Sequence, residues 1–280
     1  MIKTVDPRQT ELRADCEKCF GFCCVALYFS ASEGFPTDKD ANTPCINLKE
    51  DFTCKVHKDL IRNGLKGCTA YDCLGAGQKV AQHTFHGLDW RQLPESAIKM
   101  FKSFLIMRQL HEILWYLAEA FALQEEPIIK EKIGLLLEKT ENLTLLEVDA
   151  LLKVDVDEHR NEVKRFLQNM SDRARKQARI GKHKYSKNIK SHQCDYFGVN
   201  LKDFDLIGAD LKGACLIAAN LKDQDLNGAN FIGADLRDAD ISGANLKNSL
   251  FLTQGQINSA KGDSNTKLPK MLRTPDHWRK

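Results

Sequence analysis

The feature of the sequence that most constrains its fold is a period of five residues between positions 194 and 251. Large apolar side chains stand at every fifth position without interruption: Tyr196, Leu201, Leu206, Leu211, Leu216, Leu221, Leu226, Phe231, Leu236, Ile241, Leu246 and Phe251. Most of them follow an Ala by two positions and an Asp or Asn by one. A period of five fits neither the helix period of 3.6 nor the strand period of 2. It predicts stacked units, none of which buries its apolar face alone.

These residues resemble the pentapeptide-repeat family, whose motif is Ala-(Asp/Asn)-Leu-x-x. The resemblance implies a right-handed, four-sided β-helix with four pentapeptides per coil, and therefore about three coils here. Leu or Phe would fill the centre, Ala would let the backbone turn past it, and coils would stack about 4.8 Å apart. The motif is replaced at Cys194, Val199, Phe204, Gln224 and Ser249 in the Ala position and at Cys215 and Leu250 in the Asp/Asn position.

The composition predicts a soluble, multidomain protein. A length of 280 residues allows two or more domains, and a formal net charge of +3 gives no global attraction to nucleic acid. The first fifteen residues are polar and carry both signs of charge, so no secretion signal is expected. No stretch reaches the roughly 20 apolar residues of a membrane span. The sequence therefore predicts a cytoplasmic protein without a membrane segment.

Eight of the ten cysteines lie between positions 16 and 73, and they predict a metal site. The candidate ligands are Cys16, Cys19, Cys23, Cys24, Cys45, Cys54, Cys68 and Cys73. In a chain without a secretion signal, this density favours metal binding over disulfides or redox chemistry. Soft thiolates favour zinc or an iron–sulfur cluster over magnesium or calcium. Eight thiols suffice for two four-thiolate sites, or for one site plus structural or redox-active cysteines.

The cysteine pattern also resembles the zinc- or iron-chelating cysteine-cluster family, which opens with Cys-x-x-Cys-x-x-Cys-Cys. The matching segments are Cys16-Glu-Lys-Cys19-Phe-Gly-Phe-Cys23-Cys24, Pro44-Cys45-Ile-Asn-Leu, Cys54-Lys-Val-His57, Cys68 and Cys73. Two features depart from the family: three residues precede the Cys-Cys pair, and no Arg-Pro precedes the last cysteines. The resemblance implies a metal site and leaves the choice between zinc and iron open.

Other candidates near the cysteines are interpreted as structural. We expect His57, His83 and His86 to be surface or packing residues rather than ligands. Gly75-Ala-Gly77 lacks the third glycine and the strand context of a dinucleotide site. It is interpreted as a turn that lets the chain leave the cysteine cluster, with phosphate binding as the alternative.

Residues 88–190 show the periodicity of helices. Pro94 suits a first helical turn, and an apolar stripe follows at Ile106, Leu110, Ile113, Leu117 and Phe121. Pro127 predicts the start of a second helix. Capping-box patterns at Thr144-Leu-Leu-Glu147 and Asp155-Val-Asp-Glu158 predict a third and a fourth, and Gly181 predicts a stop.

A basic run extends from Arg173 to Lys190 and contains eight Lys or Arg and no acidic residue. We interpret it as a solvated helix end followed by a linker over 186–191, because cations are favoured at a helix C-terminus. Contact with a nucleic-acid backbone is the alternative.

After Phe251 the period fails. The stretch from Thr253 to Gly262 predicts a short capping helix, and Thr266 to Trp278 an extended segment in which Trp278 packs rather than binds a ligand. A β-helix has open backbone edges at its ends. We therefore expect this segment to cover one end and the helical region the other.

These observations predict a multidomain α + β protein with three parts: a cysteine-rich metal-binding region over 1–87, a helical bundle and basic linker over 88–190, and a right-handed quadrilateral β-helix with its cap over 191–280. The favoured function is a metal-containing scaffold whose β-helix binds a protein partner, since no catalytic set is visible outside the cysteines. The alternatives are a zinc- or iron–sulfur-dependent redox protein or metalloenzyme, and a DNA mimic acting on gyrase. Against the mimic, three coils would rise only about 14 Å, and the repeat carries mixed charge.

Overall fold

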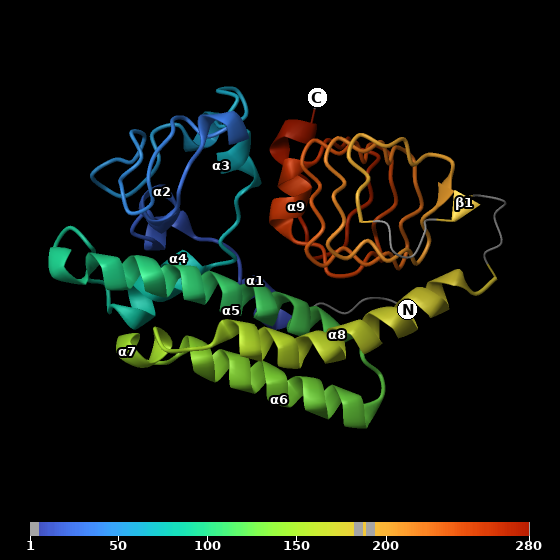
Figure 1. Ribbon diagram of the computed structural model, residues 1–280, viewed down its shortest axis with the longest axis horizontal. Coiled ribbons are helices and arrows are strands. Elements are labelled where there is room, and N and C mark those ends of the chain that lie inside the picture. The colour runs from blue at the N-terminus through green and yellow to red at the C-terminus, as the bar shows by residue number, and fades with distance from the viewer. Residues whose placement is uncertain (1–5, 182–186, 189–193, 280) are drawn as a thin grey trace. The chain divides into compact units, whose positions relative to one another are not determined.

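The computed structural model describes residues 6–181, 187–188 and 194–279, and they fall into two compact units (Figure 1). The cysteine–helix unit comprises residues 6–68 and 72–167, and the repeat unit comprises residues 69–71 and the described residues from 168 onward. Two helices, α3 (Lys66–Ala70) and α8 (Val156–Arg179), run from one unit into the other. The predicted division into three parts at residues 87 and 190 stays a prediction.

The cysteine–helix unit begins with very short elements and ends with long helices. The short ones are α1 (Pro7–Glu11), η1 (Cys16–Lys18), α2 (Phe22–Ala26), η2 (Ala31–Glu33), η3 (His57–Asp59), α4 (Ala76–Lys79), η4 (Val80–Thr84) and η5 (Pro94–Ser96). The rest are α5 (Ala97–Leu123), α6 (Pro127–Thr144) and α7 (Val148–Leu151). Pro94 and Pro127 each begin a helix, as predicted, because a helix start does not need the missing N–H.

Helix α5 is the core of this unit. It packs against α1, α2, α4 and α6, and the side chains of Met100, Phe104, Met107 and Leu110 are fully buried. An apolar surface that covers most of a helix predicts burial on several sides. The predicted stripe is only partly right, because Ile106 and Phe121 are half-buried while other positions of α5 supply more of the core.

One predicted helix start is wrong and another is confirmed. Thr144 is the last residue of α6, where its hydroxyl donates to the Glu141 carbonyl at 2.7 Å instead of capping a new helix. The short α7 begins after Glu147 without a side-chain cap. Asp155, by contrast, accepts the Glu158 N–H at 2.9 Å and caps the start of α8.

The repeat unit is a stack of coils held together by parallel bridges between residues twenty apart. Asn200 pairs with Asn220 and Asn220 with Asp240, while Asp210 pairs with Asn230. The predicted central side chains are buried, with Leu201, Leu211 and Leu221 fully enclosed. Backbone N–H groups reach the next coil, as from Leu201 to the Asn220 carbonyl at 2.9 Å. The five-residue period therefore marks residues that face the inside of a β-helix.

The Asp and Asn residues of the motif have a structural role at each corner. Their Oδ1 atoms accept the N–H two residues ahead, as Asp195 does from Phe197 at 3.0 Å and Asn230 from Ile232 at 3.1 Å. This local bond lets a short side chain satisfy the backbone where the chain turns. Side chains also join successive coils, since the Asn230 amide donates to Asp210 at 3.1 Å. At this pair, the Asn stands where a second Asp would place like charges one above the other.

The segment after the repeat caps one end of the coils, as predicted. Helix α9 (Gln254–Ser259) lies across that end (Figure 1) and begins with a capping box between Thr253 and Gln256. The Gln256 amide donates to the carbonyls of Phe231 and Ala234, both at 2.8 Å. Lys261 and Lys267 then continue two of the parallel ladders. Trp278 packs in the buried interior, with its Nε1 donating to the Ala260 carbonyl at 3.0 Å.

The prediction that the helical region covers the other end of the coils stays a prediction, because most of that region belongs to the other unit. Residues of α8 lie along a side of the coils, where an added Cβ at Gly228 would stand 2.4 Å from Ala178 Cβ. The backbone edge of the first coil is paired in part by β1 (Lys187–Asn188), which runs parallel to β2 (Phe204–Asp205). The rest of the predicted linker lies outside the described residues.

Candidate functional site

The cysteine motif is anchored to the helical core through the aromatic residues within it. Phe22 is fully buried and stacks on Phe104 of α5, with ring centroids 5.6 Å apart. Phe20 lies against Phe52, and its carbonyl accepts the Trp90 indole N–H at 2.9 Å. Gly21 between them has a φ of +66°, a conformation that glycine adopts without strain. The cysteines on either side are thereby held at the surface of a rigid core.

Two glutamines join the start of the cysteine motif to the segment after Cys73. The Gln78 amide donates to the Arg13 carbonyl at 2.8 Å and accepts the Asp15 N–H at 2.6 Å. Gln82 donates to the Lys18 carbonyl at 3.0 Å. A Cβ at Gly77 would lie 2.5 Å from Cys19 Sγ, so this sulfur rests directly on the glycine backbone. Residues more than fifty positions apart are thus brought together.

Four thiols at this junction interact electrostatically with one another, and we name them the first cysteine group: Cys16, Cys19, Cys23 and Cys73. Burial raises the pKa of Cys16 to about 11 and that of Cys19 to about 12, and repulsion from Cys73 adds to both. Burial raises the pKa of Cys73 as well, while N–H groups of Gly77 and Gly75 oppose this. Backbone N–H groups that face sulfur stabilise a thiolate, which is the form that binds metal.

The other four thiols form the second cysteine group: Cys24, Cys45, Cys54 and Cys68. Burial raises the pKa of Cys68 to about 12, and repulsion from the other three members adds to it. Cys24 and Cys45 are joined through the backbone, since the Cys45 N–H donates to the Cys24 carbonyl at 2.9 Å. The Asn47 N–H lies 3.4 Å from Cys45 Sγ, and the Val56 N–H lowers the pKa of Cys54 against its burial.

The adjacent cysteines Cys23 and Cys24 stand at the boundary between the two groups. Their sulfur atoms are 3.9 Å apart and share a hydrogen bond. This bond raises the pKa of Cys23 and lowers that of Cys24. Of the two thiols, Cys24 is therefore the one whose thiolate form is favoured.

The donor set suits a soft metal, although the thiols do not yet converge on a point. All eight cysteines are free, and backbone N–H groups act on the sulfur atoms of Cys19 and Cys73 among others. Over residues 6–181, 187–188 and 194–279, no three or more His, Cys, Asp or Glu side chains are arranged to hold a metal ion. Binding an ion would require side chains of a group to turn toward a common centre.

The three histidines interpreted as structural, His57, His83 and His86, are exposed. Desolvation lowers the pKa of His83. Gly75-Ala-Gly77 lies at the turn after Cys73, as its structural interpretation predicted. Gly75 has a φ of +77° and begins α4, which leads the chain away from the cysteines.

A buried lysine, which the sequence analysis missed, lies beside the second cysteine group. The ammonium of Lys39 donates to the carbonyls of Val25 at 3.3 Å, Asp40 at 3.1 Å and Leu27. It also lies 4.5 Å from the centroid of the Phe29 ring. Burial lowers the pKa of Lys39, whereas Cys45 and Cys24 raise it. A lysine in a polar segment is indistinguishable in sequence from the many exposed ones.

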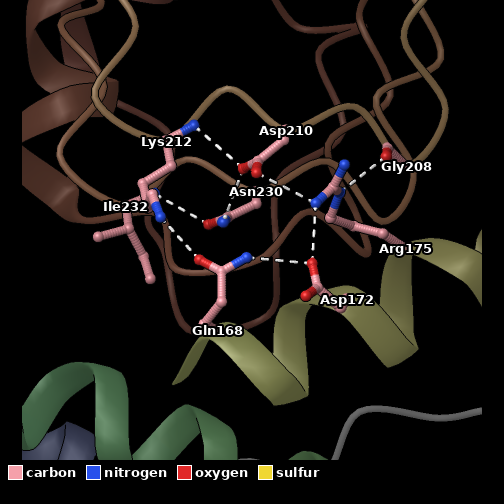
Figure 2. A network of polar contacts seen from close by, with 8 residues as sticks. All are labelled: Gln168, Asp172, Arg175, Gly208, Asp210, Lys212, Asn230 and Ile232. Atoms are coloured by element: carbon pink, nitrogen blue, oxygen red, sulfur yellow. Dashed lines mark hydrogen bonds and ion pairs between the residues drawn. The ribbon is translucent and has the colours of Figure 1, made fainter. Parts of the chain in front are cut away.

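In the repeat unit, part of the basic run is used inside the protein. Figure 2 shows Arg175 between α8 and the coils, where its Nε donates to the Gly208 carbonyl at 3.0 Å. Its guanidinium also pairs with Asp172 and Asp210, both at 3.1 Å. Arg179 donates to the Ile207 carbonyl at 3.0 Å. Arg175 and Arg179 therefore hold the helix on the coils. The sequence interpretation had treated the whole basic run as solvated and did not predict this role.

A second contact in Figure 2 fixes the position of α8 along the coils. Lys212 donates to Gln168 at 2.6 Å, and Gln168 in turn donates to Asp172 at 3.1 Å. The side of the coils that carries Gly208 and Gly228 is thus covered by protein.

Another side of the coils carries a column of exposed or half-buried side chains. Phe197 is 65% exposed, Ile217 is half-buried, and Arg237 is exposed. They lie on successive coils, since the Gly198 N–H donates to the Ile217 carbonyl at 2.8 Å and the Ala218 N–H to the Arg237 carbonyl at 2.9 Å. We name these three residues the Phe197 column.

Charges on the coils are mixed rather than uniformly acidic. Asp195 pairs along its ladder with Cys215 and then Asp235, and a second ladder runs from Asp225 through Asn245 to Lys267. Lys222 forms an ion pair with Asp240 at 2.9 Å. Among the described residues, no helix is both long enough and apolar enough to cross a membrane.

Comparison with known proteins finds similarity at two levels. The Pentapeptide repeats family matches residues 193–223 and 214–251, with eight copies. A Bacillus subtilis (strain 168) protein, "Uncharacterized protein YybG", is 52% identical over 269 residues, which are 96% of this chain and 95% of that protein. A crystal structure of a pentapeptide repeat protein, Rfr23 from the cyanobacterium Cyanothece 51142, is 29% identical with a TM-score of 0.22. That match covers 29% of this chain and 56% of the other, little more than half its length.

Proposed function

Since the chain belongs to the same family as YybG of Bacillus subtilis and carries pentapeptide repeats, we propose that it is a metal-binding scaffold for a protein partner. The observation that carries the scaffold role is the Phe197 column on a β-helix with a regular backbone ladder. A rigid surface binds a partner without first losing conformational freedom. Phe197 and Arg237 belong to residue types that are enriched at protein interfaces.

The scaffold role is tested by substitution on this column. Immobilised wild-type protein should retain a partner from an extract of its native cell, and the double variant Phe197→Glu, Ile217→Glu should lose it. Lys247→Glu, an exposed change elsewhere on the coils, is the control and should retain the partner. Retention by the column variant equal to wild type would show that this surface is not the binding site.

The metal role rests on the two cysteine groups and is the second part of the proposal. Each group contains four thiols, and either zinc or an iron–sulfur cluster would suit them. A bound metal would contribute folding energy to a region built of short elements. We place the protein in the cytoplasm, where a reducing environment keeps thiols free for metal.

The metal role is tested by elemental analysis and a visible spectrum of protein purified without air. Stoichiometric zinc without colour supports a structural site in a scaffold. Iron together with an absorption band at about 400 nm would indicate an iron–sulfur cluster. That result favours the alternative of a redox protein or metalloenzyme. Protein that contains neither zinc nor iron would contradict both the metal-binding scaffold and the redox or metalloenzyme alternative.

The DNA-mimic alternative is less favoured, because a protein that mimics DNA would need a continuously acidic surface. The ladders place Cys215, Asn245 and Lys267 among the aspartates. A supercoiling assay with gyrase distinguishes the two, because a mimic would inhibit or protect the enzyme and a scaffold for another protein would leave it unchanged.

A further inference from the structure

The position of Lys39 raises the question of what balances its charge. Three carbonyl oxygens, from Val25, Leu27 and Asp40, accept hydrogen bonds from its Nζ atom. A neutral amine has only two N–H donors, whereas an ammonium has three. The geometry therefore assigns a charged ammonium to a residue that is only 9% exposed.

A buried charge is costly unless an opposite charge accompanies it. The carboxylate of Asp40 acts on Lys39, but Asp40 is exposed, so water screens part of its charge. The Phe29 ring offers a cation–π contact, which replaces only part of the lost hydration. The other groups of opposite potential charge that act on Lys39 are the thiols of Cys45 and Cys24, with a smaller contribution from Cys23.

We propose that Lys39 is the counter-ion of an anionic metal–thiolate centre formed by Cys24, Cys45, Cys54 and Cys68. This inference rests on the proposed metal binding and adds a residue that is not itself a ligand. Four thiolates around a divalent ion carry a net charge of −2, so a fixed positive charge beside them stabilises the loaded centre. Lys39 also donates a hydrogen bond to the carbonyl of Val25, the residue next to Cys24. This bond fixes the backbone that carries the proposed ligand Cys24.

A nearby lysine provides a matched control. Lys49 also acts on a member of the group, Cys54, but its side chain is 43% exposed and pairs with Asp51 at 3.2 Å. Water and Asp51 screen its charge, so it should contribute little to the centre. The substitutions Lys39→Met and Lys49→Met remove the same charge in buried and exposed surroundings.

The test is anaerobic titration of metal-free full-length protein with cobalt(II) alone, followed by the thiolate-to-cobalt charge-transfer absorption and competition with a chelator. We expect Lys39→Met to weaken one of two cobalt centres by about 10- to 100-fold, in the range for outer-shell partners of metal ligands. Lys49→Met should stay within about twofold, as expected for a screened surface charge. Lys39→Arg, which keeps the charge, should retain both centres.

The outcomes separate this inference from the function on which it rests. A wild-type protein that binds no cobalt would overturn the proposed metal role and, with it, the counter-ion. Normal binding by wild type and by Lys39→Met alike would overturn the counter-ion alone. If Lys39→Met does not fold, the arginine variant decides, because a folded Lys39→Arg protein that has lost one centre would show that charge is not what matters.

Discussion

The repeat unit and the cysteine-rich part of the cysteine–helix unit stabilise themselves in different ways. In the coils, each kind of motif residue has a partner within the protein: Leu221 is fully buried, and Asp210 accepts both a backbone N–H and the Asn230 amide. Between Cys16 and Cys73 the elements are three to five residues long, and eight thiols stand free. Short elements bury too little apolar surface to be stable alone, and a metal is a common remedy. In the coils the motif residues are satisfied within the protein, whereas the cysteine-rich segment carries free thiols, for which we propose a metal ligand.

The largest expected effect comes from breaking the second cysteine group. Cys24→Ser with Cys45→Ser should remove a metal and unfold the cysteine-rich part, because structural zinc contributes an apparent 10–16 kcal/mol in small domains, so a loss of about 10 kcal/mol is the scale. The measurements are elemental analysis and thermal unfolding. The control, Cys194→Ser with Cys215→Ser in the coils, should keep both metal content and stability. Equal behaviour of the two variants would remove the distinction between the regions.

The next effect concerns the interior of the coils. Phe231 is fully buried, and Phe231→Ala should lower the free energy of unfolding by about 3–5 kcal/mol because it leaves a cavity. Phe197→Ala makes the same change at a side chain that is 65% exposed, and it should cost less than about 0.5 kcal/mol. Urea unfolding of both variants provides the comparison. A cost below about 1 kcal/mol for Phe231→Ala would not fit a packed interior.

A pH effect should arise in the cysteine–helix unit at His111. This residue is buried and bonds the Leu74 carbonyl at 2.6 Å, and burial lowers its pKa from 6.5 to about 4. Because the unfolded chain binds the proton more readily, stability is fully present above pH 6.5 and falls as the pH drops toward 4. The scale is about 3 kcal/mol, from 1.36 kcal/mol per pKa unit. His111→Asn keeps a donor for the carbonyl and should flatten this part of the profile; an unchanged slope would contradict the assignment.

A smaller effect tests how α8 lies on the coils. Gly228 and Gly233 have similar φ values of +70° and +64°, but a Cβ would meet Ala178 only at Gly228, while nothing lies within 4 Å at Gly233. Both substitutions by Ala carry the cost of a left-handed residue, about 1–2 kcal/mol. Gly228→Ala should lose about 1–3 kcal/mol more because of overpacking. Chemical denaturation of the two variants would show equal losses if α8 did not pack here.

The sequence alone predicted much of the repeat because local chemistry repeats there. The period identified the buried residues, and the end of the period at Phe251 indicated where the capping segment with α9 begins. The prediction at Thr144 was wrong because this residue ends α6 and its hydroxyl donates to the Glu141 carbonyl within that helix. The grouping of the cysteines depends on Gln78 and Phe22, which join residues distant in sequence. The burial of Lys39 and the intramolecular use of Arg175 likewise depend on neighbours that no sequence period records.

The measurement that tests the central difference most directly is hydrogen exchange of the full-length protein, with and without removal of metal by a chelator under reducing, air-free conditions. The account predicts that amides between Cys16 and Cys73 lose protection when metal is removed, whereas amides between Leu201 and Phe251 keep theirs. Unchanged protection in both regions would contradict the proposed dependence of the cysteine-rich part on a metal.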